Sequence, residues 1–483
     1  MAKPNLSNLQ ACVDEATTAW LEIMQSTDPE DPTDYSNVVA RLQKANREIS
    51  PLHRKMIWRP ITDLITDLGE KDFNKLLSVD PEREKVGGVV LDFLQAIFQH
   101  AEKYEEDATL AFQEVVNDLF DGFLSAEDRR SAKRPDFIVI PPLVKWGDRT
   151  VGPYTLLITD IIPLGISTSI VALPTTLTRK GIALWTSLAH ETTGHNILLG
   201  DKGLRSELRQ IVRQVLTEDF GKPKAEYWAL RIDEVASDVL GVLNMGPAAA
   251  IGLIIGIKGI RAARGGSSEA GKLQTTKKND SPYPIDALRA YLVAGAVERL
   301  AFSDAHDWAE SLRDEINKDV GEQTLDVKDA STNAIEISFS KAESIAIANK
   351  VAEIIVEKQL VSLDGFSFGN IQNWRNRDEE VLLKLSGFIS TPTDNLELVS
   401  KFVADKSLFA AHVVASTLTT ALSNRGDLNA FFTQMIKLLK AMHLANAPAI
   451  APYNSDFTRF ELLGSEKIEP AHSISGKCNT VGS

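Results

Sequence analysis

The chain has 483 residues, a length that predicts two or three domains. With 43% hydrophobic and 24% charged residues, its composition is that of a globular protein. Its formal net charge of −14 argues against a nucleic-acid-binding protein and against attraction to anionic membranes, because both need a basic surface. Two cysteines allow no disulfide framework and the first residues lack the apolar core of a signal peptide, so we expect a cytoplasmic protein.

The N-terminal part of the chain, residues 1–134, is predicted to be helical. Apolar residues recur at helical spacing in residues 89–98 and 110–116. Proline-containing segments at 28–32 and 130–135 interrupt this pattern. The second of these segments therefore marks the expected end of a helical N-terminal region.

Three short segments rich in β-branched residues follow, each bounded by Gly or Pro, and they predict a small sheet. They cover residues 137–144, 154–158 and 167–173. Pro174 ends the third segment, so we expect this strand at the edge of the sheet. Thr178 is the expected N-cap of a helix over residues 179–199.

A second helix is predicted over residues 226–244, followed by a break at Gly246-Pro247 and an apolar helix over 248–257. This apolar run is shorter than the roughly 20 residues that a membrane-spanning helix needs. Residues 264–282 have the composition of a flexible loop. Part of this loop resembles a phosphate-binding loop, but Leu273 stands where Ser or Thr is needed and no strand precedes it.

The remaining chain, residues 301–483, is predicted to be mostly helical. One strand is expected at 335–339, and a capping box at Ser340 and Glu343 then begins a helix. The predicted fold class is therefore α+β and predominantly α-helical. Helical N- and C-terminal regions flank a core over residues 135–300, which contains the small sheet and the helices predicted between residues 179 and 257.

The string His190-Glu191-Thr192-Thr193-Gly194-His195 is the clearest chemical signal in the chain. Catalytic zinc needs three protein ligands and an open position for water, and the two imidazoles supply two ligands. Glu234, on the next predicted helix, is the best candidate for the third ligand. Asp238 lies one turn later on the same face, where its carboxylate can accept the outer N–H of a ligand histidine. Glu191 is then the expected general base for a metal-activated water.

The spacing of the two histidines conflicts with a regular helix, because they lie five residues apart. In an ideal α-helix, residues i and i+4 are separated by about 40° around the axis, whereas i and i+5 are separated by about 140°. A single-turn π-bulge removes this mismatch. Gly194 and the two threonines before it weaken regular helix, so we predict such a bulge between the histidines.

These residues resemble the zinc metallopeptidases whose third ligand is a glutamate, and the His-Glu-x-x-Gly-His form is similar to that of the dipeptidyl peptidase III family. That family pairs the motif with Glu-Glu-x-x-Ala-Asp, whereas residues 233–238 here read Asp-Glu-Val-Ala-Ser-Asp. The likeness spans about residues 178–247. It implies a metallopeptidase-like core in which Zn²⁺, one per chain, is bound by His190, His195 and Glu234, with Glu191 catalytic and Asp238 supporting a ligand.

The predicted function is a zinc-dependent hydrolase, in the first place a peptidase, that acts on a peptide or protein substrate. The ligand set favours zinc over iron or manganese. A hydrogen-bond donor for the developing oxyanion is expected beside the metal. Four downstream residues are candidates for it, namely Tyr283, Arg289, Tyr291 and His306.

The alternative is a non-catalytic, metallopeptidase-like scaffold or protein-interaction module whose helical flanks bind partners. In the plainest interpretation, His190 is a buried, hydrogen-bonded residue and His195 binds carbonyls at a helix C-terminus. Glu234 and Asp238 would then belong to a solvated helix face. The pattern indicates neither a cleavage specificity nor an oligomeric state.

Overall fold

A computed structural model of the protein describes most of residues 4–446. The residues outside the description are 1–3, 28, 84, 126–132, 134, 137–139, 148–151, 162–163, 167, 266–270, 392–398, 400–401, 403, 405–406 and 447–483. The described chain is an α+β protein that is predominantly α-helical, as predicted, with two three-stranded sheets of mixed direction. The predicted boundaries near residues 134 and 300 stay predictions.

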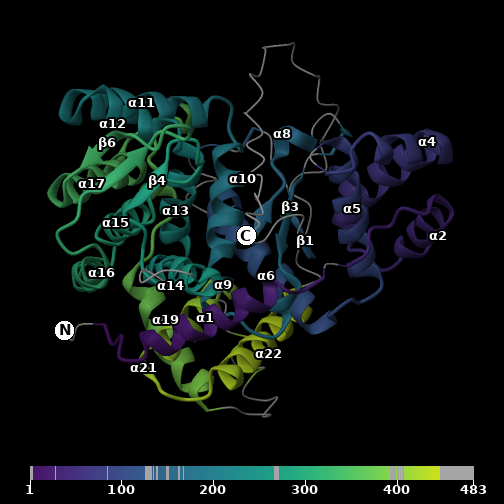
Figure 1. Ribbon diagram of the computed structural model, residues 1–483. Helices are drawn as coiled ribbons and strands as arrows, with labels where there is room; N and C mark the ends of the chain where they lie inside the picture. The colour runs from purple at the N-terminus through teal and green to yellow at the C-terminus, as the bar shows by residue number, and fades with distance from the viewer. Residues whose placement is uncertain are drawn as a thin grey trace.

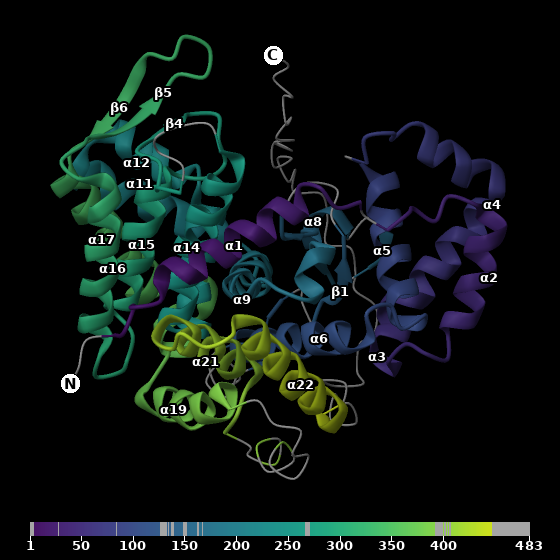
Figure 2. The ribbon, with the colours of Figure 1, turned by 60° about the horizontal axis from the view of Figure 1, so that its bottom comes forward.

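Helices dominate the N-terminal part of the chain, as its apolar spacing predicts. Their bounds are α1 Leu9–Ile23, α2 Tyr35–Ala45, α3 Pro51–His53, η1 Arg54–Trp58, α4 Arg59–Ser78, α5 Val86–Ala101, α6 Glu106–Phe120 and η2 Asp121–Ser125. Helices α2, α4 and α5 form one group beside the first sheet (Figure 1). Helix α1 lies apart from this group. It packs along α14 (Pro247–Arg264) and against α9 (Ile182–Trp185), as Figure 2 shows.

The first sheet has the strand order β1-β3-β2, with β1 (Leu143–Trp146) parallel and β2 (Tyr154–Thr155) antiparallel to β3 (Ile170–Leu173). The predicted edge position of the third strand is therefore wrong, because β3 lies in the centre. Pro174 follows the last paired residue, so its missing N–H removes no ladder hydrogen bond. All three strands are shorter than predicted, and the second segment ends in the short helix α8 (Ile158–Ile161). Residues 137–139 and 167 of the predicted strands lie outside the described residues.

The outer edge of β1 is covered by side chains of α5 and α6 instead of by another strand. The Gln99 amide donates to the carbonyl of Trp146 and accepts its N–H, both at 2.7 Å. Gln113 accepts the N–H of Val144 at 3.2 Å and donates to the carbonyl of Pro142 at 2.9 Å. Because the amide of Gln offers a donor and an acceptor, it satisfies a strand edge much as a backbone peptide does. These contacts close an edge that could otherwise pair with another chain.

Two histidines extend this row of contacts along the same backbone. His100 Nε2 lies 3.1 Å from the carbonyl oxygen of Val144, and His53 Nε2 lies 3.0 Å from that of Pro141. A carbonyl only accepts, so each Nε2 carries the hydrogen. His53 is almost fully buried, and this burial lowers its pKa to about 4. Burial likewise lowers the pKa of His100 to about 3, so both histidines support the sheet in the neutral form.

The second half of the chain builds a helical group around the second sheet. The helices are α11 Leu204–Phe220, α12 Lys222–Ala229, α13 Ile232–Met245, α14, α15 Asp286–Val297, α16 Ala305–Val320 and α17 Lys341–Glu357. The strands are β4 Thr276–Lys278, β5 Leu325–Lys328 and β6 Ile335–Phe339, in the order β4-β5-β6. The predicted strand at 335–339 is confirmed as β6, and the predicted capping box at Ser340 and Glu343 is also confirmed.

Three other predictions in this half need correction. The helix predicted over 226–244 is two helices, α12 and α13, interrupted at Leu230 and Arg231. The Arg231 guanidinium donates to the carbonyl of Tyr227, which supports the chain at this break. The apolar helix predicted over 248–257 continues to Arg264, and the predicted loop 264–282 contains β4. Residues 266–270 of that loop lie outside the described part of the chain.

The C-terminal part adds further helices beneath the core, seen at the bottom of Figure 1. They are α18 Phe368–Ile371, α19 Asn376–Ser390, α21 Ala410–Ser423 and α22 Leu428–Asn446. Aromatic rings join this layer to the sheet, because Trp185 of α9 lies 5.9 Å from Phe432 and 6.3 Å from Trp146, measured between ring centroids. No helix within the described residues is both long and apolar enough to cross a bilayer.

The neutral state of His53 makes the protein less stable in mild acid. Its pKa is about 4 in the folded state and about 6.5 in the unfolded chain, so the unfolded chain binds the proton first as the pH falls. The contribution of neutral His53 to the free energy of unfolding is therefore present above about pH 6.5 and is lost as the pH falls below it. At pH 5 this loss amounts to about 2 kcal/mol. We expect His53→Gln, which keeps a donor for Pro141, to lose less unfolding free energy between pH 7.5 and pH 5 than the wild type. Urea unfolding at both pH values measures this, and equal losses would contradict it.

Candidate metal centre

The histidine motif lies in a π-helix, which confirms the predicted bulge. After α9 the chain forms η5 over Ala189–Gly194 and then α10 over His195–Leu198. The i→i+5 turn takes up one extra residue, so residues five apart face the same side. The ring centroids of His190 and His195 consequently lie 5.0 Å apart. The spacing that conflicts with a regular helix is the spacing that this turn requires.

The start of this segment differs from the prediction. Thr178 is the last residue of a 3₁₀ helix, Thr175–Thr178, and does not cap the helix that leads to the histidines. Helix α9 begins after Gly181, whose φ of 91° favours glycine. The carboxylate of Glu15 on α1 accepts the N–H of Gly181 at 2.5 Å. A side chain from a distant helix thus takes the capping role that the local sequence assigns to Thr178.

Two glycines allow α13 to approach η5 closely, and the two elements lie side by side between β3 and α15 (Figure 1). A Cβ atom on Gly194 would lie 2.1 Å from Cβ of Ser237, a separation that no side chain can adopt. A Cβ atom on Gly241 would lie 3.2 Å from the backbone nitrogen of His190. Because the helices meet almost backbone to backbone, short side chains on α13 can reach the histidines.

The three predicted ligands converge at this contact. His190, His195 and Glu234 each offer one ligand atom, and these atoms lie within 4.8 Å of one another. His190 Nε2 and Glu234 Oε2 are 3.3 Å apart. Ligand atoms about 2.0–2.1 Å from a tetrahedral zinc ion are about 3.3 Å from each other. This pair therefore already has the spacing of two zinc ligands.

The chemistry of the donors also fits a cation. The Glu234 side chain is only 15% exposed, and its Oε2 atom faces His190 Nε2. This buried oxygen has no well-aligned hydrogen bond from the described residues. A buried carboxylate oxygen without a donor is costly, and a bound metal ion removes that cost. Two neutral imidazoles and one carboxylate form a ligand set that suits zinc.

Asp238 holds the first histidine from behind. Its Oδ1 atom lies 2.8 Å from His190 Nδ1, so the predicted contact between these two residues is present. Burial opposes the charge of Asp238, but the Arg289 guanidinium and His190 outweigh it and lower the pKa of Asp238 to about 2. Burial likewise opposes the charge of His190, while the carboxylates of Asp238 and Glu234 raise its pKa to about 10. In the absence of a metal, a proton on Nε2 thus faces Glu234, and a metal ion would have to displace it.

Glu191 lies on the sheet side of the same turn, where β2 reaches it. The hydroxyl of Thr155 lies 2.8 Å from Glu191 Oε2 and 2.9 Å from the backbone oxygen of Glu191. This contact engages Oε2, and among the described residues no hydrogen bond to Oε1 accompanies it. Thr155 is absent from the predicted site because a threonine in a short strand carries no local signature of a metal centre.

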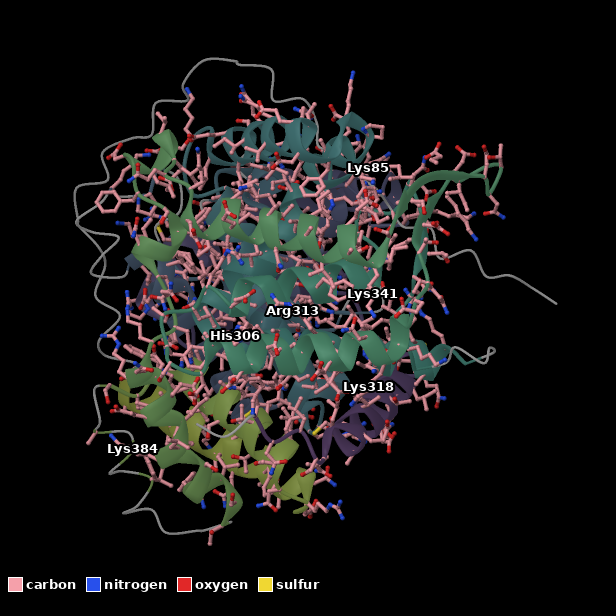
Figure 3. All side chains as sticks on the ribbon, turned by 90° about the vertical axis from the view of Figure 1, so that its left-hand side faces the viewer. Lys85, His306, Arg313, Lys318, Lys341 and Lys384 are labelled. Atoms are coloured by element: carbon pink, nitrogen blue, oxygen red, sulfur yellow. The ribbon has the colours of Figure 1, made fainter. Side chains whose placement is uncertain are left out.

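Of the four candidate donors, Tyr283 is the one whose phenol lies within the influence of both Glu234 and Glu191. The negative charges of Glu234 and Glu191 raise the pKa of its phenol, so it stays a neutral donor. Arg289 is engaged by Asp238, and the Tyr291 hydroxyl donates to Asn317 at 2.8 Å. His306 lies on the outward face of α16 beside Arg313 (Figure 3), with its side chain 68% exposed.

Alanine at position 194 is expected to disrupt the centre. The added methyl group would overlap Ser237, and overpacking of this kind costs about 1–3 kcal/mol. Gly194→Ala should therefore lower the thermal unfolding midpoint and weaken binding of a metal ion at this centre, as measured with added zinc in competition with a chromogenic chelator. Gly387→Ala on α19 is the control, because a Cβ atom there meets nothing within 4 Å. Equal behaviour of the two variants would show that the close approach is dispensable.

No model of a known protein family matches this chain, and neither does any curated protein or solved structure. The likeness to zinc metallopeptidases is therefore confined to the motif residues. Within the described part of the chain, these residues form a group of two histidines and one glutamate that could hold a metal ion.

Proposed function

We propose that this protein is a zinc-dependent hydrolase that cleaves peptide bonds, with one zinc ion held by His190, His195 and Glu234. The observation that supports this most directly is the convergence of their ligand atoms within 4.8 Å of one another, with His190 Nε2 and the buried Glu234 Oε2 only 3.3 Å apart. A further carboxylate, that of Glu191, lies in the same π turn. A metal site with an adjacent carboxylate is the minimum that metal-assisted hydrolysis requires.

Glu191 has the surroundings of a general base. A zinc ion bound at this centre would lower the pKa of a water molecule toward about 7 and would polarise a substrate carbonyl. The Thr155 hydroxyl, 2.8 Å from Oε2, holds the Glu191 carboxylate against β2. Oε1 can then accept the proton of the attacking water and transfer it to the leaving amine. Only 8% of Glu191 is exposed, so bulk water competes little for that oxygen.

Tyr283 supplies the hydrogen-bond donor that the reaction needs. Its phenol stays protonated because Glu234 and Glu191 disfavour a third negative charge beside them. The residue is 40% exposed, which leaves it open to a substrate. We assign to Tyr283 the donation of a hydrogen bond to the oxyanion that develops on the substrate carbonyl.

Zinc binding is the first test of this proposal. Elemental analysis of purified protein should find about one zinc per chain, and both His190→Ala and Glu234→Ala should lose it, because each removes one of three ligands. His306→Ala is the matched control, since that imidazole is exposed and lies outside the centre. Zinc retained by the two ligand variants would refute the assigned ligands.

Glu191→Gln separates binding from chemistry. The amide keeps the shape of the side chain but cannot accept a proton, so the variant should bind zinc normally and lose about 10²–10⁴-fold in kcat. Turnover can be followed by mass spectrometry of a mixed peptide library. Glu322→Gln, at a side chain that is 94% exposed, controls for the loss of one charge. Full activity of Glu191→Gln would refute the mechanism, whereas a wild type that binds zinc without turnover would support the scaffold alternative.

A further inference from the structure

Arg289 on α15 grips the carboxylate behind the metal centre with two hydrogen bonds. Its Nε donates to Asp238 Oδ2 at 2.8 Å, and its Nη2 donates to Asp238 Oδ1 at 2.7 Å. The Arg289 side chain is 11% exposed and that of Asp238 is 1% exposed. A two-pronged contact of this kind fixes the plane of the carboxylate as well as its position. The Asp238 carboxylate therefore cannot rotate about its Cβ–Cγ bond without breaking these hydrogen bonds.

The same carboxylate oxygen serves the metal centre. Asp238 Oδ1 accepts Nη2 of Arg289 and also faces Nδ1 of His190 at 2.8 Å. One oxygen atom thus separates the guanidinium from the imidazole, and the direction of the imidazole is set from α15. Outer partners of this kind fix the ring direction of a ligand histidine and commonly determine 10- to 100-fold of metal affinity.

Arg289 has a second neighbour on the substrate side. Its Cζ lies 5.0 Å from the ring centroid of Tyr283, within the range of a cation–π contact. Lys277 approaches the same ring, with Nζ 5.6 Å from the centroid. The ring of Tyr283 therefore rests beside the guanidinium that also holds Asp238, and a change in that guanidinium reaches both.

We propose that Arg289 is a positioning residue that couples the orientation of His190 to the placement of Tyr283. It touches neither the metal ligands directly nor the reacting atoms. Its effect on metal affinity depends only on the contacts through Asp238. Its effect on turnover rests on the proposed function, because it acts through Tyr283.

Lysine at position 289 tests the coupling, because it keeps the charge and loses the two-pronged contact. Arg289→Lys should bind zinc about tenfold more weakly than wild type in chelator competition, and its kcat should fall as well. The matched control is Arg261→Lys. Arg261 is another largely buried guanidinium, with its Nε 2.9 Å from Asp286 Oδ2. Among the described residues it has no hydrogen bond or ion pair with Asp238 or Tyr283. Arg261→Lys should keep the zinc affinity and kcat of the wild type.

Double-mutant cycles distinguish positioning from general stability. Asp238→Asn should weaken zinc binding by itself, and adding Arg289→Lys should weaken it little further, because both act through one contact. In kcat, Arg289→Lys and Tyr283→Phe should likewise combine to less than the product of their separate effects. Additive effects in both cycles overturn the coupling. If Arg289→Lys does not fold, Asp238→Asn alone decides, and wild-type zinc affinity in that variant overturns the proposal.

The outcomes separate the two proposals. Zinc binding that is equal in Arg289→Lys and wild type, or weakened equally by Arg261→Lys, overturns the positioning role and leaves the proposed function intact. A wild-type protein that binds no zinc overturns the proposed function itself. Tenfold weaker zinc binding with unchanged kcat confirms the link to His190 and overturns the link to Tyr283.

Discussion

The close approach of η5 and α13 is the contact on which the candidate centre depends. A π turn is rare because its hydrogen bonds and packing are less favourable than those of an α-helix, so the surroundings must stabilise it. Here Gly194 lies so close to Ser237 that even a methyl group would overlap it. Gly241 of α13 likewise lies close to the backbone of His190. These contacts hold the turn in place, bring His190 and His195 to one side, and set Glu234 opposite them.

The centre extends through four neighbouring elements. Thr155 of β2 contacts Glu191 of η5, His190 of η5 contacts Asp238 of α13, and Asp238 contacts Arg289 of α15. Each contact joins one element to the next, so the positions of the functional groups follow from the packing of a sheet edge and three helical segments. This arrangement explains how groups far apart in sequence meet at one place: none is positioned by its own helix alone.

Sequence patterns predict the local features of this site and miss the features that arise from packing. The bulge between His190 and His195 follows from helical geometry, and Glu234 and Asp238 follow from the spacing along one helix face. Thr155 and the contacts of Arg289 could not be predicted, because strand order and the docking of α15 leave no periodic trace. The central position of β3 cannot be predicted for the same reason, because Pro174 indicates where the strand ends but not which strands lie beside it.

The balance of charges favours a cation over a purely structural network. Glu191, Glu234 and Asp238 place three carboxylates around the histidines, and Arg289 offsets only one of them through its contact with Asp238. In a structural ion-pair network each buried carboxylate oxygen would have a donor, because an unpaired one is costly. Glu234 Oε2 has no well-aligned donor among the described residues, and the atom that it faces, His190 Nε2 at 3.3 Å, is itself a candidate metal ligand. A divalent ion between His190 and Glu234 would add positive charge and give that oxygen a partner.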